Sequence, residues 1–231
     1  MDEKMIEQEK IFFKQLEEKS KDNPIVRIQA AADYITGFLK QAFTTPKGVQ
    51  GDAFCYMLAT MAGVAVANSA KENHSRNALF SMLNPSFTAR SKVETKAGIF
   101  WIGDDINKYL FNSPLSVWNI VMMIYSQNRG KENLPDLQQM VEENASNMGN
   151  PDTRVWNDTH NPYREINNAI QTYANLLQRL EPYKLQSDEY VSAFAISLGS
   201  MILNVESVFP KGLDCLRMSM ETTLFYAHMD V

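Results

Sequence analysis

"AFCYMLATMAGVAVANSA", residues 53–70, is the stretch that decides the fold, because eighteen consecutive residues carry no charge. A run of this length lies at the lower limit for a helix that spans a membrane. Thr60, Asn68 and Ser69 interrupt its apolar character, and Asp52 stands directly before it. We therefore expect a central helix that is buried in protein, and no membrane partner.

A second stretch, "PYKLQSDEYVSAFAISLGSMILN" (182–204), aligns without gaps to residues 46–68, and six of the 23 positions are identical. Gly63 and Gly199 form one of the identical pairs. Glycine inside a helix costs about 1 kcal/mol relative to alanine, so its presence at equivalent points of two helices suggests a close approach of backbones. We expect the two helices to cross at Gly63 and Gly199, about a pseudo-two-fold axis.

The similarity extends upstream, because an amphipathic helix with a proline at its start precedes each aligned stretch. The chain therefore divides into two duplicated helix pairs and an intervening block, namely residues 23–73, 161–209 and 75–160. Chance similarity between helices of like composition is the alternative. An aspartate at the start of each apolar helix, Asp52 or Asp188, is expected to cap it.

The composition predicts an all-α fold, a multi-helix orthogonal or bundle-like domain that spans residues 1–231. Only 10 glycines and 9 prolines interrupt the 231 residues, which favours long helices. A chain of this length is able to build one core. The exception is "KAGIFWIG" (96–103), whose β-type residues predict a short β-hairpin or strand near residues 92–102.

Charge and cysteine content limit the partners and the compartment. The net charge of −5, with no run of five basic residues, argues against nucleic acid as a partner. The charged start "MDEKMIEQEK" has no features of a signal peptide, so we expect a cytoplasmic protein. Cys55 and Cys215 lie in apolar helical patterns and are expected to be small buried thiols rather than a disulfide or metal pair.

Two adjacent carboxylates, Asp104 and Asp105, follow a glycine in "FWIGDDINKY" (100–109). Carboxylate oxygens are ligands that a hard cation such as magnesium prefers, so the pair is a candidate metal or acid–base site. Adjacent acids are also common at helix starts, where they stabilise the positive end of the helix. We favour this second interpretation.

The segments "DDINK" (104–108) and "NDTHNPYRE" (157–165) resemble the two acidic, magnesium-binding motifs of class I terpenoid synthases, an all-α enzyme family. The second resemblance rests on Asn157, Asp158 and Glu165. The chain departs from the family at Lys108, where a further Asp is expected, and at Asn161, where Ser or Thr is expected. The proline at position 162 also falls inside the second motif, and we do not assign the chain to this family.

Aromatic residues surround the acidic pair, and a pocket lined by aromatics with a few polar groups is typical of a ligand site. The residues that we predict for it are Trp101, Asp104, Asp105 and Trp118. The three histidines lie in separate segments without the spacing of metal ligands, and phosphate-binding glycine motifs are absent. We therefore predict no metal site and no cofactor.

These patterns favour a protein-interaction or self-associating module over an enzyme. The apolar positions along residues 5–16 are the expected contact surface, for a second copy in a homodimer or for a protein partner. The alternative is a metal-assisted enzyme that acts on a phosphorylated or acidic small molecule through Asp104 and Asp105. A third reading is a helical binder of a small molecule, with Trp101 and Trp118 in its pocket.

Overall fold

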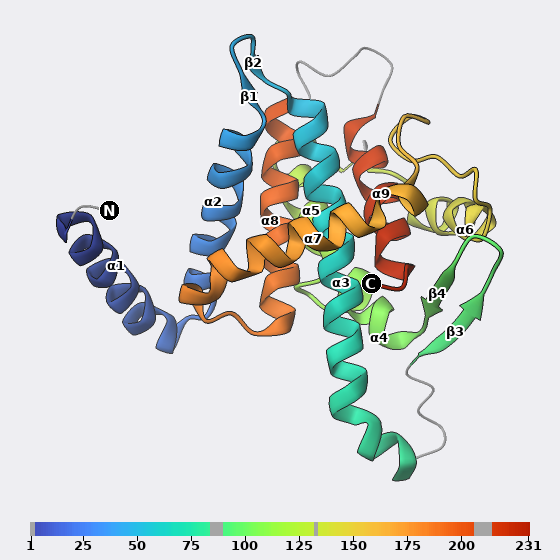
Figure 1. Ribbon diagram of the computed structural model, residues 1–231, viewed down its shortest axis with the longest axis horizontal. Coiled ribbons are helices and arrows are strands. Elements are labelled where there is room, and N and C mark those ends of the chain that lie inside the picture. The colour runs from blue at the N-terminus through green and yellow to red at the C-terminus, as the bar shows by residue number, and fades with distance from the viewer. Residues whose placement is uncertain (1–2, 84–89, 132–133, 206–213) are drawn as a thin grey trace.

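A computed structural model describes residues 3–83, 90–131, 134–205 and 214–231, and it confirms the predicted all-α class (Figure 1). The helices are α1 (Glu3–Asp22), α2 (Ile25–Ala42), α3 (Gly51–Leu83), α4 (Asp104–Asn107), α5 (Val117–Arg129), α6 (Leu137–Asn147), α7 (Pro162–Leu180), α8 (Ser187–Val205) and α9 (Cys215–His228). Two short turns, the π-helical η1 (Lys108–Asn112) and the 3-10 helical η2 (Glu181–Tyr183), follow α4 and α7. The strands are β1 (Thr44–Thr45), β2 (Gly48–Val49), β3 (Ser91–Glu94) and β4 (Ile99–Ile102).

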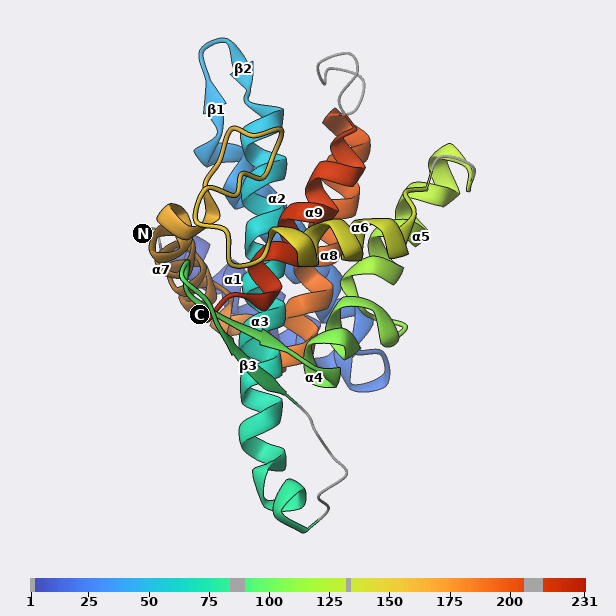
Figure 2. The same ribbon diagram turned by 90° about the vertical axis from the view of Figure 1, so that its right-hand side faces the viewer.

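The two apolar helices α3 and α8 lie side by side at the centre of the molecule (Figures 1 and 2). Helix α3 also packs against α9 and α7, and α8 also packs against α5 and α2. By length and composition, residues Gly51–Asn73 of α3 are apolar enough to cross a membrane, and 83% of that window is buried inside the protein. The protein itself covers this helix, as expected for the core helix of a folded domain.

The predicted contact between Gly63 and Gly199 is wrong, although α3 and α8 do pack together. A Cβ built on Gly63 would lie 2.6 Å from the carbonyl oxygen of Thr223 in α9. A Cβ built on Gly199 would lie 3.0 Å from Cδ1 of Ile124 in α5. Gly63 thus allows the close approach of α9, and Gly199 allows the close approach of α5. The contact between α3 and α8 uses other sides of the two helices.

The pattern of helix contacts is the one that a duplicated arrangement would produce. Helix α8 packs on α2, the helix that precedes α3, and α3 packs on α7, the helix that precedes α8. Each of the two central helices also packs against one further helix, α3 against α9 and α8 against α5. The duplication of residues 23–73 and 161–209 around the block 75–160 stays a prediction.

Helix starts differ in part from the sequence expectation. Asp52 and Asp188 lie in the first turns of α3 and α8 and are not their N-caps. At α8, the Oε2 atom of Glu189 instead accepts a bond from the backbone N–H of Gln186 at 2.7 Å. Helix α3 also continues without a break to Leu83. The sequence at residues 210–212, Pro-Lys-Gly, predicts a turn that lies outside the described residues.

The hairpin expected near residues 92–102 is confirmed. Strands β3 and β4 pair in antiparallel fashion, with Ser91 opposite Ile102 and Glu94 opposite Ile99. The segment after α9 lies along β4, where Met229 forms a bridge with Phe100, and the N–H of Asp230 donates to the carbonyl of Ile99 at 3.1 Å. The hairpin is thereby fastened to the helical body.

Both cysteines are free and buried, as expected. Cys55 in α3 and Cys215 in α9 interact with each other at the packed contact between these helices. This contact and burial raise the pKa of the Cys55 thiol. The thiols are therefore part of the core packing.

Candidate functional site

The acidic pair lies at the first turn of the short helix α4, after Gly103 as its N-cap. Asp104 is exposed and Asp105 is buried, so the two carboxylates face different surroundings. The Oδ1 atom of Asp105 accepts a bond from the side-chain amide of Asn73 in α3 at 3.0 Å. This geometry matches the helix-start interpretation, because carboxylates stabilise the N-terminal end of a helix.

Trp101 joins the hairpin to the residues after α9. Its indole N–H donates to Oδ1 of Asp230 at 2.7 Å, and its carbonyl oxygen lies 2.8 Å from Nδ1 of His228. The guanidinium of Arg90 stacks over the indole, 4.3 Å from the ring centroid. Burial lowers the pKa of Arg90, and the negative charges of Asp230 and Asp105 act in the opposite direction.

The structure therefore brings Trp101 and Asp105 near one arginine, with Asp104 at the surface. Trp118 lies elsewhere, half-buried on α5 and packed against the core. None of these four residues lines the hollows that we describe below for the resolved parts of the chain. Their assignment as a ligand site stays a prediction.

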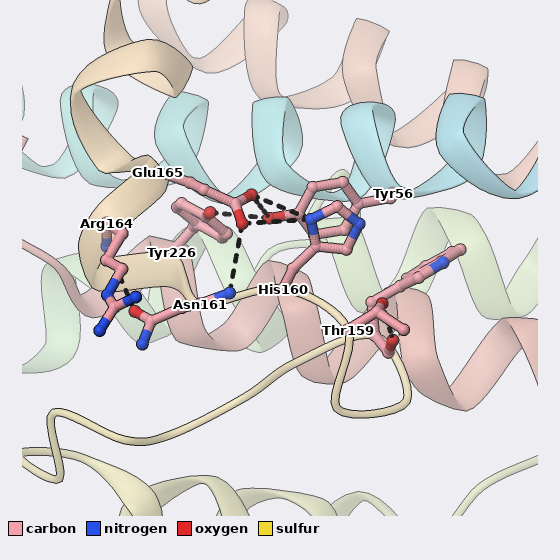
Figure 3. A network of polar contacts seen from close by, with 8 residues as sticks. Tyr56, Thr159, His160, Asn161, Arg164, Glu165 and Tyr226 are labelled. Carbon is pink, nitrogen blue, oxygen red and sulfur yellow. Dashed lines mark hydrogen bonds and ion pairs between the residues drawn. The ribbon is translucent and has the colours of Figure 1, made fainter.

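A second polar cluster, which the sequence did not disclose, joins α3, α7, α9 and the loop before α7 (Figure 3). The hydroxyl of Tyr56 bonds Oε2 of Glu165 at 2.6 Å and the hydroxyl of Tyr226 at 3.0 Å. Nδ1 of His160 lies 3.1 Å from the same Oε2, and the backbone N–H of Asn161 donates to Oε1 at 3.2 Å. The carboxylate of Glu165 thus bonds three groups, one from α3 and two from the loop before α7.

The rings reinforce this cluster. His160 stacks on Tyr56 with centroids 3.8 Å apart and planes inclined by 14°. The indole of Trp156 meets the edge of Tyr56 at 5.7 Å. Burial raises the pKa of Tyr56 and of Tyr226, so both hydroxyls keep their protons and are able to donate.

The loop that presents His160 has an uncommon backbone. Trp156, Asn157 and Asp158 all have positive φ angles, between 54° and 60°, and the loop closes through a bridge between Val155 and His160. A left-handed conformation costs roughly 1–2 kcal/mol for each residue other than glycine. Such strain persists where the surroundings fix the chain, and here the buried Trp156 and the stacked His160 do so.

The acidic segment 157–165 is therefore used differently from the terpenoid synthase motif that it resembles. Asn157 and Asp158 lie in the left-handed turn, whereas Glu165 lies in the first turn of α7 and Asn161 is the N-cap of that helix. Within the resolved ranges, no group of three or more His, Cys, Asp or Glu side chains is arranged to hold a metal ion. The hydrogen bonds of Glu165 and Tyr56 connect α3, α7, α9 and the loop before α7.

Helix α1 lies at the edge of the molecule and forms an open V with α2 (Figure 1). Its C-terminal half packs on η2, where Phe13 meets the edge of Tyr183 at 5.2 Å and Glu17 pairs with Lys184 at 3.0 Å. Burial raises the pKa of Tyr183 to about 12. Hollows of about 730 Å³ and 450 Å³ lie along two sides of α1, and Leu16 lines both of them.

No family model matches the chain, and neither the curated proteins nor the solved structures contain a match. The function has to be argued from the geometry alone.

The sequence did hold one signal of the Tyr56 cluster. A buried tyrosine hydroxyl needs a hydrogen-bond partner, and Tyr56 lies in the stretch 53–70, which carries no charged residue. The partner had to come from another segment, and His160 and Glu165 flank the start of the next amphipathic helix. Their convergence with Tyr226 depends on the packing of three helices, which residue spacing does not reveal.

Proposed function

We propose that this protein is a helical module that associates with a second copy of itself through α1. The proposal rests on an apolar side of α1 that the described residues leave uncovered, where Met5 is 59% and Phe12 is 46% exposed. Leu16 continues the same side one turn later and is buried. The apolar stripe thus extends past the surface that the rest of the chain provides for it.

The spacing of the stripe suits an antiparallel pair of α1 helices. Met5 and Phe12 are seven residues apart, almost two full turns, and therefore lie on one side of the helix. Two copies that cross between residues 8 and 9 would place each Phe12 against Met5 of the other copy. Gln8 would then face Glu9 of the second copy, so that an amide donor meets a carboxylate. Such a contact is self-complementary, as a two-fold dimer requires.

The exposed side of α1 also continues onto α2. The hollow of about 450 Å³ between the two helices is lined by Phe12, Leu16 and the first residues of α2, among them Ile25. Ile25 is itself 54% exposed. A second copy of α1 that lies on Phe12 would cover the edge of this hollow and would add apolar area to the contact.

Sedimentation velocity of the full chain over a range of concentrations tests the proposal. We expect a dimer that dissociates on dilution, and Phe12→Glu should leave only monomer because it places a charge in the apolar contact. Ile11→Glu is the matched control. Ile11 is also exposed, at 49%, but it lies about 100° around the helix from Phe12. A wild-type protein that stays monomeric at about 200 μM, or equal effects of the two substitutions, would contradict the proposal, because the dimeric fraction rises with protein concentration.

Metal-assisted catalysis through Asp104 and Asp105 lacks comparable support. The two side chains differ in exposure, and Asp105 already bonds Asn73. A catalytic pair needs both carboxylates to converge on one substrate position. The exposed stripe of α1 is therefore the stronger basis for a function.

A further inference from the structure

A groove on another side of α1 is lined by both apolar and basic side chains. It has a volume of about 730 Å³ and lies between α1, the start of α2 and η2. Of its apolar lining, Leu16 and Tyr183 are buried, whereas Ile6 and Phe13 are half-buried. Phe13 follows Phe12 directly and therefore points about 100° away from it around the helix. The groove is thus distinct from the exposed side of α1 that carries Phe12.

The charge of the groove is opposite to that of the whole chain. Among the described residues that line it, five are basic and two are acidic, a surplus of three positive charges, whereas the chain carries −5. Two of the basic residues have carboxylate partners, because Lys184 pairs with Glu17 at 3.0 Å and Arg27 pairs with Glu189 at 2.6 Å. The remaining positive charge favours an anionic partner over a neutral one.

The three other basic residues form a row along α1, namely Lys10, Lys14 and Lys21. Steps of four and seven residues keep them on one side of the helix, and the row extends over about 16 Å at 1.5 Å of rise per residue. All three are exposed, and within the described residues none of them forms an ion pair. Lys10 and Lys14 repel each other, because like charges four residues apart are neighbours on a helix. Carboxylates of a partner would relieve this repulsion.

The apolar side chains beside this row have the spacing of a surface that packs against a helix. Ile6 and Phe13 are seven residues apart, and Leu16 follows three residues later. This is the a and d pattern of helices that lie side by side, and Lys10 stands at an e position, from which charges reach the second helix. An amphipathic helix is the kind of ligand that an apolar groove with this spacing accepts.

We propose that this groove binds an acidic amphipathic helix of a partner protein. The apolar stripe of that helix would lie on Ile6 and Phe13, and its carboxylates would pair with the lysine row. A nucleic acid fits less well, because it would make no use of the apolar lining and would meet the negative charge of the rest of the chain. The proposal does not depend on self-association, since it uses another side of α1.

The probe is a fluorescein-labelled peptide of about 18 residues, with leucines in heptad spacing and glutamates beside them, which as a helix of about 27 Å spans the lysine row. Two peptides of equal length serve as controls, one with lysine in place of each glutamate and one with the same composition in scrambled order. Titration with the full chain is followed by fluorescence anisotropy. The chain carries Phe12→Glu, which removes the proposed α1 dimer contact, so the two proposals fail independently.

We expect a Kd of about 10 μM for the acidic amphipathic peptide, at least about tenfold tighter than for either control. The affinity should fall as the salt concentration rises, because salt screens the exposed lysines. Equal affinity for the scrambled peptide would overturn the proposal. So would binding of phosphatidylglycerol vesicles or single-stranded DNA in place of the peptide.

Substitutions on α1 locate the binding site. Lys14→Glu should weaken binding of the acidic peptide about tenfold, because it replaces an attraction with a repulsion. Lys19→Glu is the matched control, since Lys19 is an exposed lysine of the same helix outside this groove, and it should change the affinity less than about twofold. Ile6→Ser should weaken binding about threefold through lost apolar contact. Equal effects of Lys14→Glu and Lys19→Glu would mean that net charge alone governs binding, and would overturn the proposal.

Discussion

Helices α3 and α1 are both long, yet the chain treats their apolar surfaces differently. Helix α3 lies in the middle of the molecule and is covered by α7, α8 and α9. Helix α1 is covered only over its C-terminal half, where Leu16 and Ser20 are buried, while Met5 and Phe12 remain exposed. Among the described residues, the apolar surface of α3 is thus covered by other helices, whereas Met5 and Phe12 of α1 are not covered. That open stripe is the basis of the proposed self-association.

The largest effect is expected from Gly63→Ala, which disturbs the packing of the covered helix α3 against α9. The new Cβ would lie 2.6 Å from the carbonyl oxygen of Thr223 and 2.7 Å from Cβ of Tyr226, and a backbone atom cannot move aside without shifting α9. We expect the free energy of unfolding to fall by about 3 kcal/mol, as measured by urea denaturation.

Gly37→Ala is the control for Gly63→Ala, because it makes the same change in a helix. Nothing lies within 4 Å of a Cβ at Gly37 on α2. Alanine should therefore stabilise the protein by about 0.5–1 kcal/mol through its better helix propensity. Two substitutions of the same sign and size would mean that α3 and α9 do not approach as closely as described.

The next effect concerns the tyrosines that the core encloses. Burial raises the pKa of Tyr173 above its ordinary value near 10. Above pH 10 the unfolded chain loses a proton that the native state keeps, so stability is full below pH 10 and declines as the pH rises. Tyr173→Phe should reduce that decline by about 0.7 kcal/mol per pH unit near pH 10, rising towards about 1.4 kcal/mol per pH unit at higher pH. Urea denaturation between pH 9 and 11 measures the slope, and an identical slope in the variant would show that Tyr173 is accessible to solvent.

A smaller loss of stability is expected from Gly199→Ala, which makes the same substitution in the other central helix, α8, where it packs against α5. Here the new Cβ would lie 3.0 Å from Cδ1 of Ile124, the far end of a flexible side chain, and 3.4 Å from Cα of Val121. We expect a loss of about 1 kcal/mol by the same denaturation measurement, because the isoleucine is able to adopt another rotamer. A loss as large as that of Gly63→Ala would mean that the backbone of α5 approaches Gly199 more closely than 3.4 Å.

The smallest effect on stability is expected from Phe12→Glu, on the exposed apolar side of α1. The side chain is 46% exposed in the single chain. The free energy of unfolding of the monomer, measured by thermal denaturation at low concentration, should therefore change by less than about 0.5 kcal/mol. The same variant should nevertheless lose the dimer. A strong destabilisation of the monomer would instead mean that Phe12 is buried further than its 46% exposure and its ring contact with Phe13 indicate.

Much of the fold could be predicted from the sequence, because helices such as α2 and α7 have clear apolar periods and the central helix α3 has a long uncharged run. The eighteen uncharged residues of α3 and the β-type run at Ile99–Ile102 each became the expected element. The partners of Gly63 and Gly199 could not be predicted, since a small residue shows where a backbone approaches but not which helix supplies it. The same holds for caps, as Glu189 rather than Asp188 bonds the free amide at the start of α8.

The candidate sites were less accessible to sequence analysis. Asp104 and Asp105 looked alike in sequence, and only the packing of α4 against α3 makes one exposed and the other buried. The Tyr56 cluster depends on a left-handed loop turn that ordinary residues seldom adopt, so no local propensity predicted it. The exposed stripe of α1 could be predicted, because apolar positions within a highly charged helix are visible directly in the sequence.

The orientation of α1 in the dimer offers the most direct test of the account. Spin labels on single cysteines at Lys14→Cys and Lys21→Cys report the distance between the two copies by pulsed electron paramagnetic resonance, while the native Cys55 and Cys215 are buried. An antiparallel pair that crosses between residues 8 and 9 predicts about 20 Å at position 14 and about 40 Å at position 21, at 1.5 Å of rise per residue. Distances that stay equal at the two positions, or the absence of any distance between copies, would contradict self-association through the antiparallel α1 contact.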